Sequence, residues 1–307
     1  MNQKYKDIYQ KSINSKEEFW KNISNDIFWY KKPTKILNSD NPPFYKWFED
    51  GITNTCYNAL DIHIDNGRGD RLAIIYDSPI TGIQKKITYN ELRDEVALFA
   101  GALKKQGVSK GDRVIIYMPM IPQAITTMLA CGRIGAVHSV VFGGFAANEL
   151  ASRIDDSKAK LIVTASCGYE PGRTVHYKPL VNKALELANH KPDKCIVFQR
   201  EKDKAELNPS IDITWQEFLK GVEPAECEQM NANDYAYILY TSGTTGLPKG
   251  IVRDIGGHIV ALKWTMKNIY NIEQDDVWWS ASDIGWIVGH SYIVYAPLFY
   301  GCTTVLF

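Results

Sequence analysis

Along residues 71–307, segments with the hydrophobic pattern of a β-strand alternate with segments that have the hydrophobic pattern of an α-helix. Short apolar runs with strand character recur, and segments whose apolar positions repeat every three or four residues lie between them. The expected strands are 71–76, 114–118, 137–142, 161–165, 195–198, 235–240, 277–280 and 303–307. The expected helices are 88–107, 123–133, 148–155, 178–189, 258–270 and one that begins at 284. This alternation predicts parallel β-α units and an α/β sheet covered on both faces.

One helix start is marked with particular clarity. Thr88 is followed three residues later by Glu91, which is the pattern of a capping box, in which each side chain satisfies the other residue's backbone N–H. Apolar residues from Leu92 to Leu103 then trace one helical face, and Gly107 marks its end.

The first 65 residues lack this alternation and are rich in aromatic and charged side chains, with clusters at 28–30 and 44–48. Taken alone, the segment could be a partner-binding arm. Interspersed Trp and Phe residues more often anchor a segment onto a core. We therefore expect an N-terminal wrap over 1–65 and a main α/β domain over 66–307.

Composition narrows the class of protein. The chain carries 35 Lys and Arg against 35 Asp and Glu, which suggests neither nucleic acid nor an anionic membrane as a partner. Six scattered cysteines without a Cys-x-x-Cys pair fit reduced thiols. The N-terminus lacks the apolar core of a secretory signal and carries early acidic residues, and segment 284–300 is too polar for a membrane span. We expect a soluble cytoplasmic protein, in preference to one of the mitochondrial matrix.

The strand 235–240 leads into Thr241–Gly250, which we call the phosphate loop. Its glycines let backbone N–H groups turn toward a phosphate, its hydroxyls add donors, and Lys249 supplies a mobile positive charge. Pro248 and Gly250 do not fit a Walker A motif, which needs Gly and then Ser or Thr at those positions. The alternative is a plain surface turn rich in Ser, Thr and Gly.

Three further segments carry candidate chemistry. Phe142–Phe145 (Phe-Gly-Gly-Phe) closes a strand where α/β proteins place ligands, although a Gly-Gly pair is also typical of a tight turn. Tyr169–Arg173 also follows a strand, and a lone Arg there is usually solvated. In Asp283–Tyr292 two glycines flank Trp-Ile-Val, so that other groups can approach closely, as in a ligand cleft. The alternative for this last segment is a buried helix with a core histidine at His290.

The phosphate loop, Arg253–Gly257 and Asp283–Tyr292 together resemble the AMP-forming acyl-CoA synthetases, and within them the acetyl-/propionyl-CoA synthetase branch. The resemblance extends over essentially the whole chain and is greatest to propionyl-CoA synthetases. It implies the α/β large domain of the adenylate-forming, luciferase-like fold. It also implies a two-step ligase: a short-chain carboxylate and Mg·ATP give acyl-AMP and pyrophosphate, and coenzyme A then takes the acyl group. Luciferase-like and peptide-synthetase adenylation domains share the loop, but Gly285–Tyr292 argues against them.

The resemblance also implies roles for particular residues. ATP phosphates and departing pyrophosphate would be held by Thr241, Ser242, Gly243, Thr244, Thr245, Gly246 and Lys249, with Lys249 and Thr244 catalytic and Thr244 also a weak candidate for the metal. The acyl pocket would be walled by Trp286, Ile287 and Val288. Coenzyme A would meet Phe142, Gly143, Gly144, Glu170, Arg173 and Val288. Acetate-using relatives commonly have Thr at the position of Val288, and some have Arg at that of Glu170, where a carboxylate would repel phosphate.

The chain ends inside the apolar run 303–307, before the later motifs and the small C-terminal domain of the family. We therefore expect a truncated chain that is inactive alone, partnered by a missing C-terminal half, and whose last strand is an unpaired edge prone to aggregation. Acetyl-CoA synthetase and a non-catalytic nucleotide- or CoA-binding remnant of the fold remain alternatives.

Overall fold

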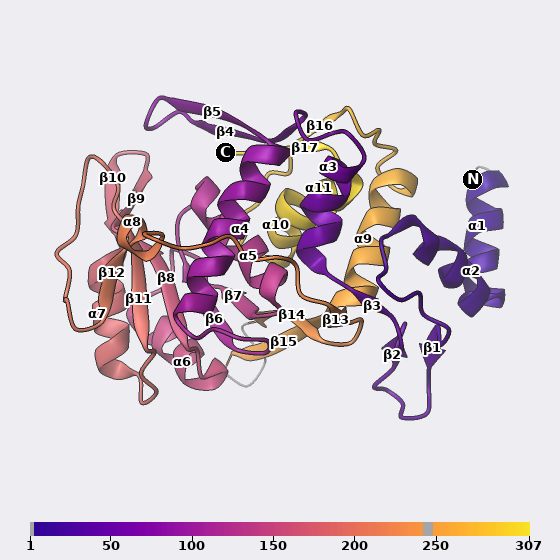
Figure 1. Cartoon of the computed structure of the whole chain (residues 1–307), viewed down its shortest axis with the longest axis horizontal. Helices are drawn as coiled ribbons and strands as arrows, with labels where there is room; N and C mark the ends of the chain where they lie inside the picture. The colour runs from indigo at the N-terminus through magenta and orange to yellow at the C-terminus, as the bar shows by residue number, and fades with distance from the viewer. Residues whose placement is uncertain (1–2, 242–247) are drawn as a thin grey trace.

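The computed structural model describes residues 3–241 and 248–307. Its centre is a seven-stranded sheet in the order β12-β11-β8-β6-β7-β14-β15 (Figure 1). The strands are β12 Asp212–Thr214, β11 Lys194–Phe198, β8 Leu161–Ala165, β6 Arg113–Tyr117, β7 Val137–Val140, β14 Tyr235–Thr241 and β15 Lys249–Asp254. Every neighbouring pair is parallel except β14 and β15. The predicted α/β sheet is confirmed.

Helices cover both faces of this sheet because successive strand residues point to opposite sides. Val114 and Ile116 of β6 belong to a buried cluster shared with α4, α5 and α9, whereas Ile115 and Tyr117 belong to one shared with α6 and α7. The bounds are α4 Tyr89–Lys105, α5 Pro122–Ile134, α6 Ala147–Ser157, α7 Tyr177–Leu187 and α9 Ile255–Asn268. The capping box is present at the start of α4, where the Thr88 side chain accepts from the Glu91 N–H.

A second, four-stranded sheet has the order β16-β17-β4-β5. Its strands are β16 Val277–Trp278, β17 Thr303–Leu306, β4 Leu72–Ser78 and β5 Ile83–Thr88. The last strand, β17, pairs in parallel with both β16 and β4. Our expectation of an unpaired edge at 303–307 was therefore wrong, because the strand that follows residue 71 supplies the missing neighbour.

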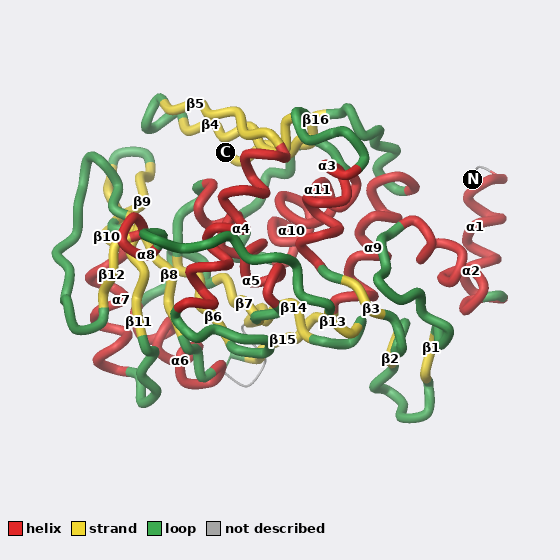
Figure 2. The backbone as a smooth tube through the Cα atoms, viewed as in Figure 1, coloured by secondary structure: helices red, strands yellow, loops and turns green. Residues whose placement is uncertain are grey.

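The N-terminal region wraps against the main body, as Figure 2 shows. Its elements are α1 Gln3–Asn14, α2 Lys16–Ile23, η1 Ser24–Asp26, β1 Leu37–Asn38, β2 Lys46–Trp47, β3 Ile52–Thr53, the π-helix η2 Tyr57–Asp61 and α3 Ile62–Asp65. Trp20 packs edge-on against Trp264 of α9 with ring centroids 6.0 Å apart, and Trp29 and Phe48 are buried. The aromatic residues of this region thus anchor it.

Three features were not expected from the sequence. β5 and β15 consist largely of exposed residues, so they lack the apolar alternation that marks a half-buried strand. The hairpin of β9 Cys167–Glu170 and β10 Arg173–His176 follows β8 almost without a break. The helix expected from 284 begins only at α10 Ile287–Gly289 and continues as the π-helix η3 His290–Tyr295 and α11 Ala296–Tyr300. The remaining elements are α8 Trp215–Phe218 and β13 Met230–Asn231.

Candidate active site

A cavity of about 450 Å³ lies at the carboxyl ends of β6, β7, β8 and β11. Each of these strands is followed by residues that line it, which is where open α/β sheets bind ligands. The lining residues that follow the strands are Pro119, Met120, Ile121, Phe142, Gly143, Gly144, Gly168, Tyr169, Glu170, Pro171 and Arg200. The β4–β5 turn, Val175, Tyr177, Asp283 and Phe307 complete the wall.

The Phe142–Phe145 turn is held in place by close packing and by hydrogen bonds. A Cβ atom on Gly143 would lie 1.9 Å from the Tyr177 Oη atom, so any other residue there would have to displace the buried Tyr177 ring. The Tyr117 hydroxyl donates to the Phe145 carbonyl at 2.8 Å and reaches the Gly143 carbonyl at 3.3 Å. The turn is therefore a fixed wall of the cavity.

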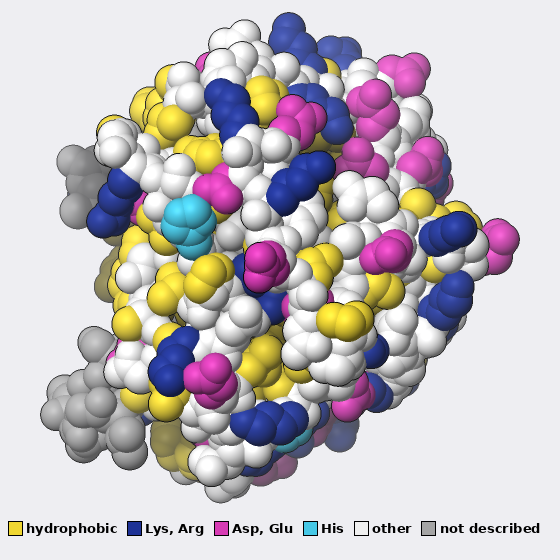
Figure 3. Space-filling view, turned by 90° about the vertical axis from the view of Figure 1, so that its left-hand side faces the viewer, with side chains coloured by type: hydrophobic (Ala, Val, Ile, Leu, Met, Phe, Trp, Pro, Cys, Tyr) yellow, Lys and Arg dark blue, Asp and Glu magenta, His cyan; other side chains and the backbone are white. Residues whose placement is uncertain are grey.

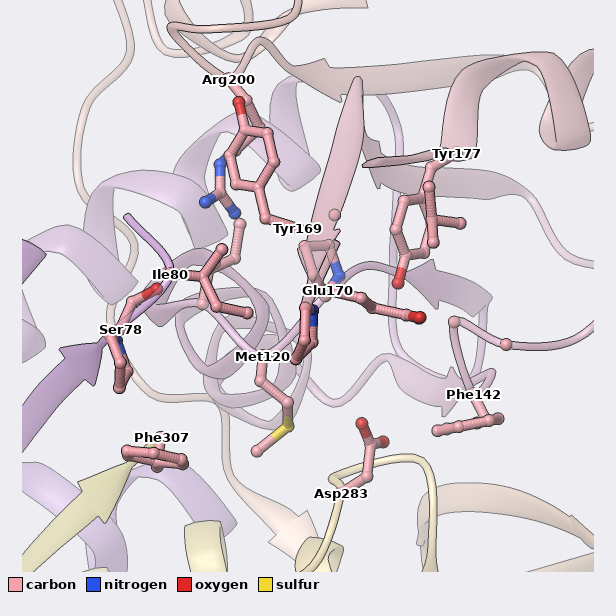
Figure 4. Close-up of a pocket in the computed structure, with 18 of the residues that line it drawn as sticks. Ser78, Ile80, Met120, Phe142, Tyr169, Glu170, Tyr177, Arg200, Asp283 and Phe307 are labelled. Carbon is pink, nitrogen blue, oxygen red and sulfur yellow. The ribbon is translucent and has the colours of Figure 1, made fainter. Parts of the chain in front are cut away.

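Acidic and basic groups occupy different parts of the cavity (Figure 4). Burial raises the pKa of the Tyr177 hydroxyl, and the neighbouring Tyr117, Asp283 and Glu170 raise it further. Burial also raises the pKa of Asp283, which accepts a hydrogen bond from the Gly285 N–H at 2.7 Å. Arg200 lies beside Tyr169, with its guanidinium carbon 4.8 Å from the ring centroid.

Arg200 links this cavity to a second one of about 340 Å³. Both cavities are lined by Tyr76, Ile121, Tyr169 and Arg200, and the second one adds Lys85 and Lys202. Arg200 is only 9% exposed. A buried cation between two cavities is suited to contact an anionic group of a ligand.

Segment 283–292 packs against the Phe142–Phe145 turn. A Cβ atom on Gly285 would lie 2.9 Å from the Phe142 Cα atom, and one on Gly289 would lie 2.0 Å from the Asp283 carbonyl oxygen. Other atoms therefore do approach these two glycines closely, as predicted, but they are backbone atoms of the protein. The His290 ring is fully buried and hydrogen-bonds to the Ile284 carbonyl at 3.0 Å.

The predicted acyl-pocket residues stand on the surface. Trp286, Ile287 and Val288 are 48%, 49% and 51% exposed and do not line the 450 Å³ cavity. The Trp286 ring nevertheless lies against the turn, with its centroid 5.5 Å from that of Phe142. Their role as acyl-pocket walls stays a prediction.

Only the flanks of the phosphate loop belong to the described residues. Thr241 ends β14 and Lys249 begins β15, and the two residues are partners in the antiparallel ladder. Ser242, Gly243, Thr244, Thr245 and Gly246, with the proposed metal role of Thr244, lie outside the described residues. Because β14 is parallel to β7, its carboxyl end points in the same direction as the strand that leads to Phe142.

The structure thus brings together Phe142, Gly143, Gly144 and Glu170 at one cavity. Arg173 lies next to them, where its guanidinium forms an ion pair with Glu170 at 2.6 Å. Sequence reasoning missed Arg200, although the rule that ligands bind after strands applies to 195–198 as it does to 137–142. It also missed Tyr177, which follows no expected strand, and it did not single out Asp283, although this residue begins the segment 283–292 and follows the expected strand 277–280.

Comparison with known proteins identifies the family. The model of the AMP-binding enzyme family matches residues 63–307, and the model of the acetyl-coenzyme A synthetase N-terminus matches residues 5–59. The chain therefore belongs to the AMP-binding enzymes. An acetoacetyl-CoA synthetase from Streptomyces lividans has the same fold, with a TM-score of 0.87 and 25% identity over 97% of this chain and 45% of its own.

Within that family the chain is similar to short-chain acyl-CoA synthetases. It is 52% identical to the mouse protein "Acyl-CoA synthetase short-chain family member 3, mitochondrial" over 99% of this chain and 45% of the relative. It is 43% identical to an acetyl-coenzyme A synthetase of Brucella anthropi over 100% of this chain and 48% of the relative. The chain spans about half the length of the curated relatives it matches.

The sequence led to two expectations about location: the absence of a membrane span and a cytoplasmic location. No helix within the described residues is both long and apolar enough to cross a bilayer. Basic and acidic side chains interleave on the face shown in Figure 3, in keeping with the balanced charge of the sequence. The mouse relative is named as mitochondrial, so the cytoplasmic location stays a prediction.

Proposed function

We propose that this chain supplies the phosphate loop and part of the thiol-substrate site of an ATP-dependent short-chain acyl-CoA synthetase. The observation that carries the proposal is the fixed Phe142–Phe145 turn, which walls a cavity at the carboxyl ends of the same sheet whose strand β14 leads into the loop. Membership of the AMP-binding enzymes adds support.

In the first step a carboxylate oxygen attacks the α-phosphate of ATP, which forms acyl-AMP and releases pyrophosphate. This step needs positioning and charge neutralisation more than covalent help from the protein. Lys249 would follow the departing pyrophosphate as a point charge, while loop hydroxyls and backbone N–H groups hold its oxygens. Mg²⁺ would neutralise further phosphate charge.

In the second step the sulfur of coenzyme A attacks the acyl carbonyl carbon and AMP leaves. We assign the nucleotide end of coenzyme A to the 450 Å³ cavity, which Phe142, Gly143 and Gly144 help to line. Arg200 is placed to meet an anionic group there, whereas Glu170 opposes one.

We propose propionate as the preferred acid and acetate as the alternative. We base this choice on Val288, because the propionate-using proteins that the chain resembles have Val at this position and acetate-using ones commonly have Thr. One methylene in an apolar pocket discriminates by about 1–3 kcal/mol, so modest activity with both acids is expected.

The test is propionate-dependent exchange of pyrophosphate into ATP, with acetate and no-acid controls. It is run on the 307-residue chain and on the chain supplemented with the polypeptide that corresponds to the remaining half of the relatives. Lys249→Gln should abolish exchange, and Lys267→Gln, which alters a lysine in the last turn of α9, should leave it unchanged.

Each result has a definite meaning. Exchange only in the supplemented mixture supports the proposal and the need for the other half. Exchange by the chain alone supports the activity and contradicts the expected dependence on that half. No exchange under any condition favours the alternative of a non-catalytic nucleotide- or CoA-binding protein, which equilibrium binding of ATP and coenzyme A would then examine.

A further inference from the structure

Two cysteines far apart in sequence meet where the N-terminal region joins the main domain. The ligand atoms of Cys56, Asp61 and Cys227 all lie within 4.8 Å of one another. The Cys227 sulfur is 3.6 Å from the Asp61 Oδ2 atom, and a hydrogen bond between the thiols raises the pKa of Cys227. Cys56 is fully buried, while Cys227 is only partly buried.

The antiparallel pairing of β3 and β13 helps to produce this contact. Ile52 pairs with Asn231, and Thr53 pairs with Met230. The ladder ends at Thr53, and Cys56 lies in the helical turn that follows it, so the ladder brings the two segments together but does not itself pair Cys56 with Cys227. The Asn54 amide holds the segments together beyond the ladder, because it donates to the Glu228 carbonyl at 2.8 Å and to the Arg133 carbonyl at 3.1 Å. The ladder and the Asn54 hydrogen bonds together hold the segments that carry Cys56 and Cys227 against one another.

A bound metal ion is the less favoured use of this cluster. Asp61 already accepts two hydrogen bonds from the Arg133 guanidinium, at 2.8 and 3.0 Å. That buried cation also lies 3.5 Å from the Cys56 sulfur, so it would repel a second cation.

We propose that Cys56 and Cys227 form a reversible intrachain disulfide when the protein meets a low-molecular-weight disulfide oxidant such as glutathione disulfide. Cys227 is the more exposed of the two thiols: its proton passes to water, and its sulfur attacks one sulfur of glutathione disulfide. This step should be slow at neutral pH and faster at higher pH, because the hydrogen bond with Cys56 and burial raise the pKa of Cys227. The oxidant's S–S bond breaks, and the departing glutathione thiolate takes up a proton. The Cys56 sulfur then attacks Cys227, which releases the second glutathione as a thiol. Two cysteine thiols are oxidised and one disulfide is reduced to two thiols.

The bond would join segments separated by most of the chain. Sulfurs within 4.8 Å must close to about 2.05 Å when the bond forms. A cross-link over so long a loop removes entropy from the unfolded chain, so the oxidised protein should denature at a higher temperature than the reduced protein.

The experiment equilibrates the chain in glutathione buffers that range from reducing to oxidising, quenches with acid, and alkylates the remaining thiols after unfolding. Peptide mass spectrometry should find the Cys56 and Cys227 peptides joined and lighter by two hydrogen atoms. The number of free thiols should fall by two from the six of the reduced chain. Cys302→Ala should still form the cross-link, and Cys227→Ala and Cys56→Ala should not, each variant having the near-UV circular dichroism of the reduced parent.

Three results would overturn the proposal. One is glutathione attached to Cys227 without a cross-link at every redox ratio. Another is a cross-link that forms only in denaturant, which would show that the folded chain holds the sulfurs apart. The third is protection of both thiols from alkylation by Cd²⁺ with no disulfide under oxidising conditions, which would assign the cluster to a thiophilic metal. None of these readouts depends on acyl-CoA synthetase activity.

Discussion

Glu170 and Arg173 neutralise one another at the rim of the 450 Å³ cavity. Two guanidinium nitrogens of Arg173 lie 2.6 and 2.7 Å from the Glu170 Oε2 atom. If the proposed coenzyme A site is correct, Glu170→Gln removes a charge that repels phosphate and frees Arg173 to attract it. Since exposed ion pairs are worth about 0–1 kcal/mol, binding of coenzyme A should tighten by up to about fivefold, as measured by titration calorimetry at low salt.

The chain offers a matched control for this change. Glu186 forms an ion pair of the same spacing with Lys183 at 2.9 Å, on α7 and away from the residues that line the cavity. Glu186→Gln alters net charge identically and should leave the dissociation constant unchanged. Equal tightening by both variants would trace the effect to overall charge, and no change in either would remove coenzyme A from the vicinity of Glu170.

At the scale of elements, we predict opposite effects on stability for Gly→Ala substitutions at two helix positions. A Cβ atom on Gly101 of α4 would lie 1.9 Å from the Glu223 backbone carbonyl oxygen, and backbone cannot move aside cheaply. Gly101→Ala should therefore lower the free energy of unfolding by about 1–3 kcal/mol, despite the better helix propensity of alanine. Urea denaturation monitored by circular dichroism measures this change.

Gly132 of α5 provides the comparison. The nearest atom to a Cβ there is the Thr55 Cβ at 3.4 Å, at the border of ordinary contact. Gly132→Ala should be neutral or should stabilise the chain by up to about 1 kcal/mol, because alanine is the better helix former. A loss at Gly132 as large as that at Gly101 would contradict the packing difference between these two helices.

Elements with a strong local signal could be predicted from the sequence. The Thr88–Glu91 capping box and the strand at 161–165 appear as expected, because local hydrogen bonding and complete burial leave a mark on the sequence. Strand β15 leaves none, since its exposed residues are held by pairing with β14. The same limit applies to the candidate site: the Phe142–Phe145 turn is visible as a motif, whereas Tyr177 reaches the cavity only through tertiary packing.

At the scale of the whole molecule, buried histidines link stability to pH. His138, His258 and His290 surround Tyr237 and Tyr295, and the Nε2 atoms of His138 and His290 are 3.0 Å apart. Burial lowers the pKa of His290 and of the separate His63 to about 4. Burial and, after it, the neighbouring titratable groups also lower the pKa of His138 and His258 well below the ordinary value. The folded chain keeps these rings neutral where the unfolded chain would protonate them.

The sign of the effect follows from proton counts. Between about pH 6.5 and the lowered pKa values, the unfolded state binds more protons than the folded state, so stability falls as pH falls. Above about pH 6.5 both states are neutral at these rings, and their contribution to folding is fully present. For each unit that the pH falls below about 6.5, each such histidine should lower the free energy of unfolding by about 1.4 kcal/mol. Urea denaturation at pH values spaced from about 7.5 to about 5.5 measures the slope, in a window above the range where most carboxylates titrate.

His63 lets the effect be assigned to a single ring. Its Nε2 atom lies 2.7 Å from the Leu298 carbonyl oxygen, and a glutamine amide can replace that donor without titrating. His63→Gln should therefore flatten the acid slope of the unfolding free energy by about 1.4 kcal/mol per pH unit. An unchanged slope in His63→Gln would mean that this ring is protonated in the folded chain, and the acid sensitivity would then belong to the cluster around Tyr237 and Tyr295.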